Sequence, residues 1–226
     1  MAKPPFLVVV TGLQAEARIA SPTLGRALIS GGDTMQLESE LHGALSEGAG
    51  AVLSFGLAAG LEPGRSPGTL IVPGEIICGS ARYRADTDWS ERLRSALGGA
   101  DSHPLIGVDA PLSRSADKLR LHEMSGAVAA DMESHIAARL ALPAGRPFAA
   151  LRVICDPAGC DLPPSAVTGM KRDGRVDLAA VLLSLLRDPR QVAGLLRVAA
   201  DARIAMSELK RCRHTLGPEF AWQAAS

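Results

Sequence analysis

Three carboxylic acids in this sequence stand shortly after apolar runs end. They are Glu16, Glu133 and Asp156. Ligands of open α/β sheets bind outside the carboxyl ends of the strands, so an acid in such a place is less often a simple surface charge. Carboxyl groups in a protected site can donate or accept protons during a reaction. The sequence therefore predicts a site at which these acids carry out proton chemistry.

Strands and helices alternate along the chain. Apolar and β-branched runs predict strands at 6–11, 25–30, 51–55, 69–78, 104–110, 127–130 and 148–155. Helices are predicted at 34–47, 88–97, 117–124 and 134–141, and again from 163 to about 213 with a break at Asp188-Pro189. Gly56–Gly60 is predicted to be a small-residue loop. The alternation predicts an α/β fold with helices on both faces of a central sheet.

Length and composition limit the class of protein. A chain of 226 residues, 47% of them apolar, can bury one sizeable core, so we expect a single domain over 1–226 with helices 163–213 packed on it. A formal net charge of zero argues against nucleic-acid binding. Scattered cysteines and an N-terminal apolar run too short for a signal peptide or membrane span favour a cytoplasmic protein. The histidines form no close pair, and we expect no metal and no cofactor.

Four short motifs, in order along the chain, resemble those of the purine and uridine phosphorylase superfamily. They are Gly12–Glu16, Gly56–Gly60, Asp131–His135 and Arg152–Asp156. The methylthioadenosine/S-adenosylhomocysteine nucleosidases are the nearer relatives within it. The resemblance implies a nucleoside phosphorylase-like domain with a mixed central sheet, a homo-oligomer, and cleavage of the N-glycosidic bond of a purine nucleoside.

A closer resemblance is to the hopanoid-associated branch, whose hallmarks are similar to Thr11–Ala20, Phe55–Gly60 and Asp131–Ser134. That branch acts on adenosylhopane, releases adenine and leaves a ribosyl or phosphoribosyl hopane. The resemblance implies an adenosyl lipid of hopanoid biosynthesis as substrate. Methylthioadenosine/S-adenosylhomocysteine nucleosidase and purine nucleoside phosphorylase are the alternatives among enzymes. A nucleoside-binding module without catalytic activity is the alternative from another class.

The resemblance gives two of the acids a role in breaking the bond between ribose and adenine. Such a bond breaks through an oxocarbenium-like state, in which the base needs a proton while a nucleophile approaches the opposite face. Asp156 would protonate purine N7, and Glu133 would accept hydrogen bonds from the ribose hydroxyls. Two plainer roles stay open. Asp156 is also placed to cap the turn at Pro157, and Glu133 to serve as an acid in the first turn of helix 134–141.

Glu16 separates hydrolysis from phosphorolysis. In the phosphorylases, as the resemblance aligns them, this position carries an arginine that binds phosphate, whereas a carboxylate repels phosphate and can deprotonate water. A second phosphorylase arginine precedes the central glycine loop, where this chain has Ser54-Phe55. Arg18 is left as a phosphate ligand, although a solvated position on a helix face is the plainer role. We therefore expect water as the nucleophile.

The other predicted site residues line the substrate. They are Met132, Gly56, Leu57, Ala58, Ala59, Pro111 and Leu112, the last two near the base. Leu57 and Cys155 depart from the nucleosidase pattern, which puts a housekeeping nucleosidase in doubt. Arg152, a charge within an apolar strand, is expected to pair with an acid near the site.

The segment 177–213 mixes leucines with arginines and lysines. Its plain interpretation is helices that pack on the sheet and leave one face in water. The sharper alternative is a surface that receives a hopane tail or makes peripheral contact with an anionic membrane.

Overall fold

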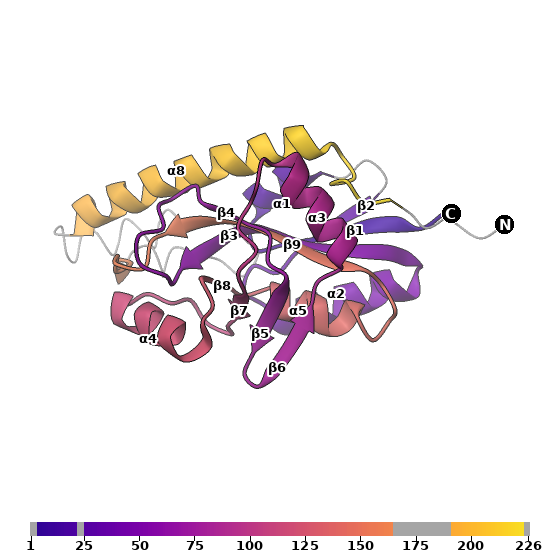
Figure 1. Ribbon diagram of the computed structural model, residues 1–226, viewed down its shortest axis with the longest axis horizontal. Helices are drawn as coiled ribbons and strands as arrows, with labels where there is room; N and C mark the ends of the chain where they lie inside the picture. The colour runs from indigo at the N-terminus through magenta and orange to yellow at the C-terminus, as the bar shows by residue number, and fades with distance from the viewer. Residues whose placement is uncertain (1–3, 22–24, 165–190, 224–226) are drawn as a thin grey trace.

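The chain folds around a nine-stranded mixed sheet, counted over residues 4–21, 25–164 and 191–223, which the computed structural model describes (Figure 1). The strands are β1 (Phe6–Thr11), β2 (Gly25–Ile29), β3 (Ala49–Gly60), β4 (Leu70–Ile71), β5 (Glu75–Cys78), β6 (Ala81–Arg84), β7 (Leu105–Gly107), β8 (Ala129–Asp131) and β9 (Phe148–Asp156). The helices are α1 (Gln14–Ala20), α2 (Thr34–Ser46), α3 (Thr87–Ala96), α4 (Ser115–Ser125), α5 (Ser134–Ala141) and α8 (Gln191–Leu216).

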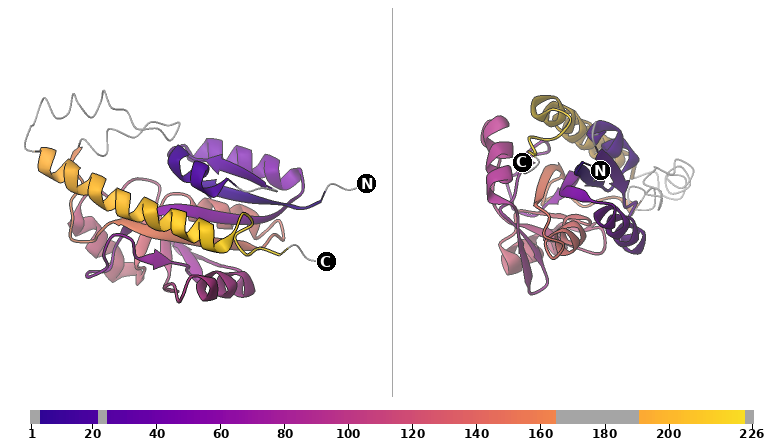
Figure 2. Two further views of the ribbon diagram at one scale, coloured as in Figure 1. Left: turned by 90° about the horizontal axis from the view of Figure 1, so that it is seen from above. Right: turned by 90° about the vertical axis from the view of Figure 1, so that its right-hand side faces the viewer.

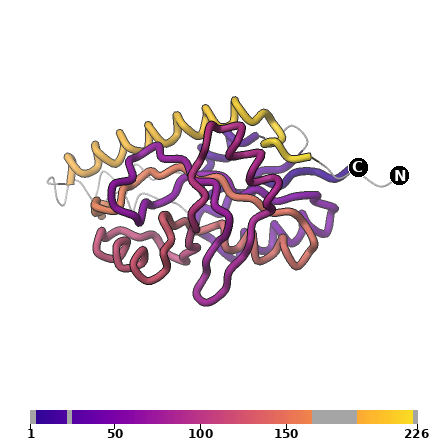
Figure 3. Tube along the Cα trace, in the orientation of Figure 1, coloured from indigo at the N-terminus to yellow at the C-terminus, as the bar shows by residue number. Residues whose placement is uncertain are grey.

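Parallel strands form the centre of the sheet. β1 pairs in parallel with β2 and with β3, and β3 pairs in parallel with β9. β8 runs antiparallel to the end of β3, and β4 runs antiparallel to β9. β5 and β6 form a hairpin that projects from the body of the molecule (Figure 3). The carboxyl ends of β1, β3 and β9 therefore point the same way, and β8 runs back toward them.

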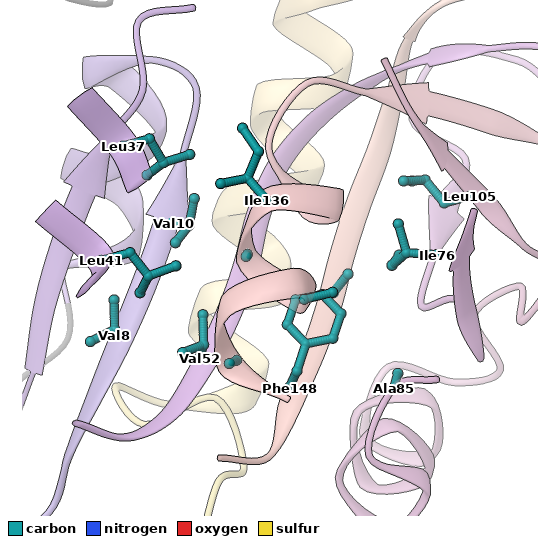
Figure 4. Packing of buried hydrophobic residues seen from close by; sticks show 14 of the residues in the cluster. Val8, Val10, Leu37, Leu41, Val52, Ile76, Ala85, Leu105, Ile136 and Phe148 are labelled. Atoms are coloured by element: carbon teal, nitrogen blue, oxygen red, sulfur yellow. The ribbon is translucent and has the colours of Figure 1, made fainter. Parts of the chain in front are cut away.

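Alternate side chains of the central strands form two apolar layers, as the period of two in a strand requires. Val8, Val52 and Phe148 belong to the layer under α2 and α5 (Figure 4). Their neighbours Leu7 and Leu53 belong to the layer shared with α1, α3 and α8. Figure 2 shows α8 running along the length of the sheet on this second face. The helices thus cover both faces.

The second half of α8 is part of the core. Leu209 and Cys212 are fully buried among side chains of the central strands. Just beyond the helix, the Phe220 carbonyl oxygen accepts a hydrogen bond of 2.8 Å from Trp89 Nε1, which links the end of the chain to α3. No helix in the described ranges is long and apolar enough to cross a membrane.

The predicted α/β fold class is confirmed, with differences in single elements. The predicted bent strand at 69–78 is two strands, β4 and β5, with Pro73-Gly74 between them. α1 and β6 are elements that the sequence did not predict, and α8 extends past the predicted end near 213 to Leu216. The predicted break at Asp188-Pro189 lies outside the described residues. The single domain over 1–226 stays a prediction.

The predicted loop at Gly56–Gly60 is wrong, because this segment is the second half of β3. Glycine and alanine have low strand propensity, which made a loop the expected structure. β9 pairs with β3 from Val52 to Ala59 and supplies the backbone partners that local propensity does not reveal. The segment is therefore a rigid wall that carries its small residues at fixed positions.

Gly56 allows two charged side chains to approach the backbone of β3. A Cβ atom at this position would lie 2.7 Å from Arg152 Nη1 and 2.7 Å from Glu16 Oε1. Both charged residues are buried, so neither has solvent into which it can retreat. A side chain at Gly56 would force the two charged groups out of place.

We expect Gly56→Ala to lower the free energy of unfolding by about 1–3 kcal/mol, the usual cost of overpacking a core. Urea denaturation followed by circular dichroism measures this change. Gly43→Ala is the matched control, because Gly43 is exposed in α2 and a Cβ there meets nothing within 4 Å. The control should gain about 0.5–1 kcal/mol as a helix-interior replacement. A Gly56→Ala protein as stable as the wild type would contradict this account of β3.

Candidate active site

A cavity of 380 Å³ lies at the carboxyl ends of the central strands. Its volume falls within the range of roughly 300–1,000 Å³ that is typical of small-molecule sites. Four acids line it: Glu16, Asp131, Glu133 and Asp156. The rest of the wall is mainly apolar and comes from β3, from the segment 108–112, and from the first half of α8. The site thus combines acids with an apolar surface.

The structure brings the predicted site residues together. Those that line the cavity are Glu16, Leu57, Ala58, Ala59, Pro111, Leu112, Met132, Glu133 and Asp156. Gly56 is not among them, since it lies behind the wall against Arg152. Their roles toward a substrate stay predictions. Arg18 does not reach this site, because it is exposed and lines a separate cavity with residues of α8.

Arg152 is a fully buried cation behind the cavity wall. Its Nε lies 2.5 Å from Asp131 Oδ2, and its Nη2 lies 3.3 Å from Glu133 Oε2. Nη2 also donates to Ser54 Oγ at 2.5 Å, and Nη1 donates to the Leu57 carbonyl oxygen at 3.3 Å. The expected pairing of Arg152 with an acid near the site is therefore confirmed. The Arg152 guanidinium thus contacts two acids and the backbone of β3 at once, which fixes their relative positions.

Glu133 is the N-cap residue of α5, and its side chain lines the cavity. Its Oε1 accepts a hydrogen bond of 2.7 Å from Ser30 Oγ, and its side chain makes no cap bond to α5. The side-chain hydrogen bond to the start of α5 comes from Asp131, whose Oδ1 accepts from the backbone N–H of Ser134 at 3.1 Å. Burial raises the pKa of Glu133, and the Arg152 cation opposes this rise. The plainer role of Glu133, as an acid at the start of helix 134–141, also fits its N-cap position, so both roles stay predictions.

Glu16 is held by backbone amides from two elements. Oε2 accepts from the N–H groups of Gly12 and Leu13, and Oε1 accepts from Leu57 N–H, each at 2.8 Å. A carboxylate has about four acceptor positions, so one more remains for a water molecule. Burial raises the pKa of Glu16 to about 7, although the Arg152 cation opposes it. A fixed carboxylate with this pKa is suited to act as a base near neutral pH.

Asp156 ends β9 and contacts a buried lysine that the sequence did not single out. Lys118 Nζ of α4 lies 2.6 Å from Asp156 Oδ2. Burial raises the pKa of Asp156 above its ordinary value, and the Lys118 cation opposes this rise. Beside it, burial raises the pKa of the Cys155 thiol to about 12, so this group stays neutral. A carboxyl group whose pKa is raised by burial and opposed by a neighbouring cation can hold a proton and also release it.

Sequence reasoning missed several residues of the site. Ser30 and Ser54 hold Glu133 and Arg152, and Lys118 holds Asp156. The apolar wall from α8 consists of Leu195, Val198, Ala199 and Ala202. Ser30 is the last residue of the strand predicted at 25–30, and its place at the carboxyl end of that strand was a usable signal. Nothing in the local pattern marked Lys118.

The part of the chain that the structure describes holds no group of three or more His, Cys, Asp or Glu side chains placed to bind a metal ion. The four acids of the cavity are separated by the hydrogen bonds and ion pairs described above.

Solved structures share this fold. A variant of Helicobacter pylori MTAN with 5'-methylthioadenosine in its active site is 12% identical, with a TM-score of 0.64 over 94% of this chain and 99% of that chain. The Streptococcus pneumoniae MTA/SAH nucleosidase in complex with 8-aminoadenine is 10% identical, with a TM-score of 0.60 over 91% and 99%. A futalosine hydrolase mutant of Helicobacter pylori is 12% identical, with a TM-score of 0.57 over 66% and 89%. At these identities the likeness concerns the fold.

Comparison with protein families gives the more specific result. In a comparison with curated proteins, no sequence matches this chain. The family model described as the phosphorylase superfamily matches residues 35–187, which is more than half of the chain and includes β3, Glu133 and Asp156. Together with the fold, this match shows that the chain belongs to the phosphorylase superfamily.

Proposed function

We propose that this protein is an enzyme that hydrolyses the N-glycosidic bond of an adenine nucleoside. The observation that carries the proposal is the arrangement of Glu16, Glu133 and Asp156 around one cavity, each held by different partners. Solved neighbours bind 5'-methylthioadenosine and 8-aminoadenine, which supports an adenine-containing substrate. The resemblance of the sequence motifs to those of the nucleosidases points to the same reaction.

Each acid has a distinct part in the proposed reaction. Asp156 gives a proton to N7 of the departing adenine, and the C–N bond breaks with its electron pair going to the base. Glu133 accepts hydrogen bonds from the ribose hydroxyls, which fixes the sugar. Glu16 accepts a proton from the water that attacks the anomeric carbon. This division between a proton donor and a base is the one used in inverting glycoside hydrolysis.

Water rather than phosphate is the proposed nucleophile. Four acids line the cavity, and no lysine or arginine among the described residues does. Arg152 is behind β3 and already contacts two acids, and Arg18 lines a different cavity. Among the described residues, a phosphate ion in this cavity would meet negative charge and no cation to bind it. Phosphorolysis by a purine nucleoside phosphorylase is therefore the less supported alternative.

The apolar wall from α8 supports a substrate with an apolar substituent on its ribose. Leu195 and Val198 line the cavity, and Val192 and Leu196 of the same helix are 43% and 67% exposed. An adenosyl group fills a cavity of this size, and a bulky tail would continue along α8. Adenosylhopane is our proposed substrate on this ground and on the motif resemblance. Methylthioadenosine or S-adenosylhomocysteine is the alternative.

A silent nucleoside-binding module is not favoured by this site. A binding protein has no use for a proton donor beside the leaving base or for a base whose pKa is about 7. The homo-oligomer and the peripheral membrane contact stay predictions. Sedimentation analysis and flotation with anionic liposomes would test them.

Incubation of the protein with adenosylhopane, methylthioadenosine or inosine tests the proposed reaction directly. We expect adenine release that does not depend on added phosphate, and no release of hypoxanthine from inosine. Chromatography of the free base measures both outcomes. An absolute requirement for phosphate would overturn the role of Glu16, and hypoxanthine release would overturn the choice of base.

We expect Asp156→Asn to lower kcat by about 100- to 10,000-fold, the usual contribution of a general acid, because an amide has no acidic proton to give. Steady-state adenine release measures the change, and circular dichroism checks the fold. Asp88→Asn is the control, since Asp88 is an exposed acid in the first turn of α3. Near-normal turnover in Asp156→Asn would remove Asp156 as the proton donor.

The pH dependence of kcat/KM reports on Glu16 in the free enzyme. Burial raises the pKa of Glu16 to about 7, and only its deprotonated form can accept a proton from water. We therefore expect kcat/KM to rise with pH through about 7 and to fall about tenfold per pH unit well below it. A profile that stays flat from about pH 5 to 8 would contradict the assignment of Glu16 as the base.

A further inference from the structure

Lys118 is the one buried residue of α4, whose other side chains reach the surface at least in part. Its side chain has no exposed area. An ammonium group taken fully out of water destabilises the fold unless other groups replace its hydration. Here Nζ lies 2.6 Å from Asp156 Oδ2 and donates to the carbonyl oxygens of Pro157 at 3.2 Å and Cys160 at 3.1 Å. A lysine at this position is therefore specifically accommodated.

The contact orients the carboxyl group of Asp156. Oδ2 is buried against Lys118, whereas the Asp156 side chain as a whole is 15% exposed and lines the cavity. Oδ1 is thus the oxygen left to face a ligand. A proton carried on Oδ1 would point into the cavity, and Oδ2 would accept a hydrogen bond from the ammonium group.

Several other charged groups act on this pair. The negative charge of Asp201 on α8 acts on the Asp156 carboxyl group. Asp161, which follows β9, lies close enough to Lys118 for their charges to interact. Asp161 also interacts electrostatically with the exposed Arg114 at the start of α4. Of the groups that act on Asp156 itself, Lys118 is the cation in contact, and Asp201 is a second negative charge.

We propose that Lys118 is a positioning residue of the reaction, which directs Asp156 Oδ1 toward the leaving base and stabilises the carboxylate that remains after proton transfer. This inference rests on the proposed function, since it needs Asp156 to be the proton donor. Charge develops on Asp156 only as the reaction proceeds. A fixed cation 2.6 Å away therefore stabilises the transition state more than the resting neutral acid.

The proton balance of the step follows from the two oxygens. The proton on Asp156 Oδ1 moves to N7 of adenine as the C–N bond breaks and its electron pair passes to the base. The oxygen of water bonds to the anomeric carbon, and its proton passes to Glu16. Asp156 is then an anion paired with the Lys118 ammonium, and exchange with solvent returns the proton from Glu16 and restores Asp156.

A purely structural role for Lys118 makes a different prediction. Through its bonds to the carbonyl oxygens of Pro157 and Cys160, the lysine would only hold the turn after β9 in place. A variant whose neutral side chain keeps these bonds, as in Lys118→Gln, would then turn over substrate like the wild type. The two roles therefore differ in whether kcat depends on the charge at position 118.

The test compares Lys118→Met with the wild type over a range of pH, using whichever of adenosylhopane and methylthioadenosine the wild type cleaves. An opposite charge in contact shifts an aspartic acid pKa down by about 1–3 units, so its removal should shift the basic limb of the kcat profile up by that amount. We expect kcat to fall by about 10- to 100-fold, part of the general-acid contribution, with KM changed less than threefold. Arg120→Met is the matched control, because Arg120 is an exposed cation on the same helix.

Lys118→Gln provides a second variant if Lys118→Met does not fold, because its amide can still donate to the carbonyl oxygens while it lacks the charge. A lowered kcat with an unmoved basic limb in the folded variant would overturn the inference. Failure of the proposed function is a separate result, because the wild-type protein would then release no adenine at any pH. A shifted basic limb of the kcat profile, together with a wild-type profile for Arg120→Met, supports Lys118 as the positioning residue.

Discussion

The buried Arg152 cation is the interaction on which the site depends. It contacts Asp131 and Glu133, lies beside Glu16, and is fully buried, with partners on β3, β8 and α5. The removal of one partner from a buried pair costs about 3–5 kcal/mol, since the other charge is then buried alone. Arg152 therefore requires acids at the ends of two different elements. The same requirement explains why β3 has a glycine where Arg152 and Glu16 approach it.

The sheet converts these local requirements into one site. Parallel pairing brings the ends of β1, β3 and β9 to one edge, and the antiparallel β8 delivers Asp131 and Glu133 back to the same edge. Each acid then receives its own surroundings. Three backbone amides hold Glu16, a serine and an arginine hold Glu133, and a lysine holds Asp156. Different surroundings allow three like groups to have three different roles.

The sequence alone allowed prediction of the elements whose signal is local. The β-branched run at 6–11 and the apolar run at 148–155 are strands in the structure because their side chains are buried on both faces. Gly56–Gly60 was predicted wrongly because its strand partner lies far along the chain. Lys118 gave no signal for the same reason, since the carboxyl group it contacts is 38 residues away. Long-range pairs of this kind are visible only once the fold is known.

The acid-lined cavity has a consequence for what the protein should leave intact. A 5'-nucleotide carries two negative charges at the carbon where an adenosyl substrate carries an apolar group. In the described part of the site such a phosphate would meet carboxylates and the apolar side of α8, without a lysine or arginine to receive it. The wall would thus select nucleosides over nucleotides.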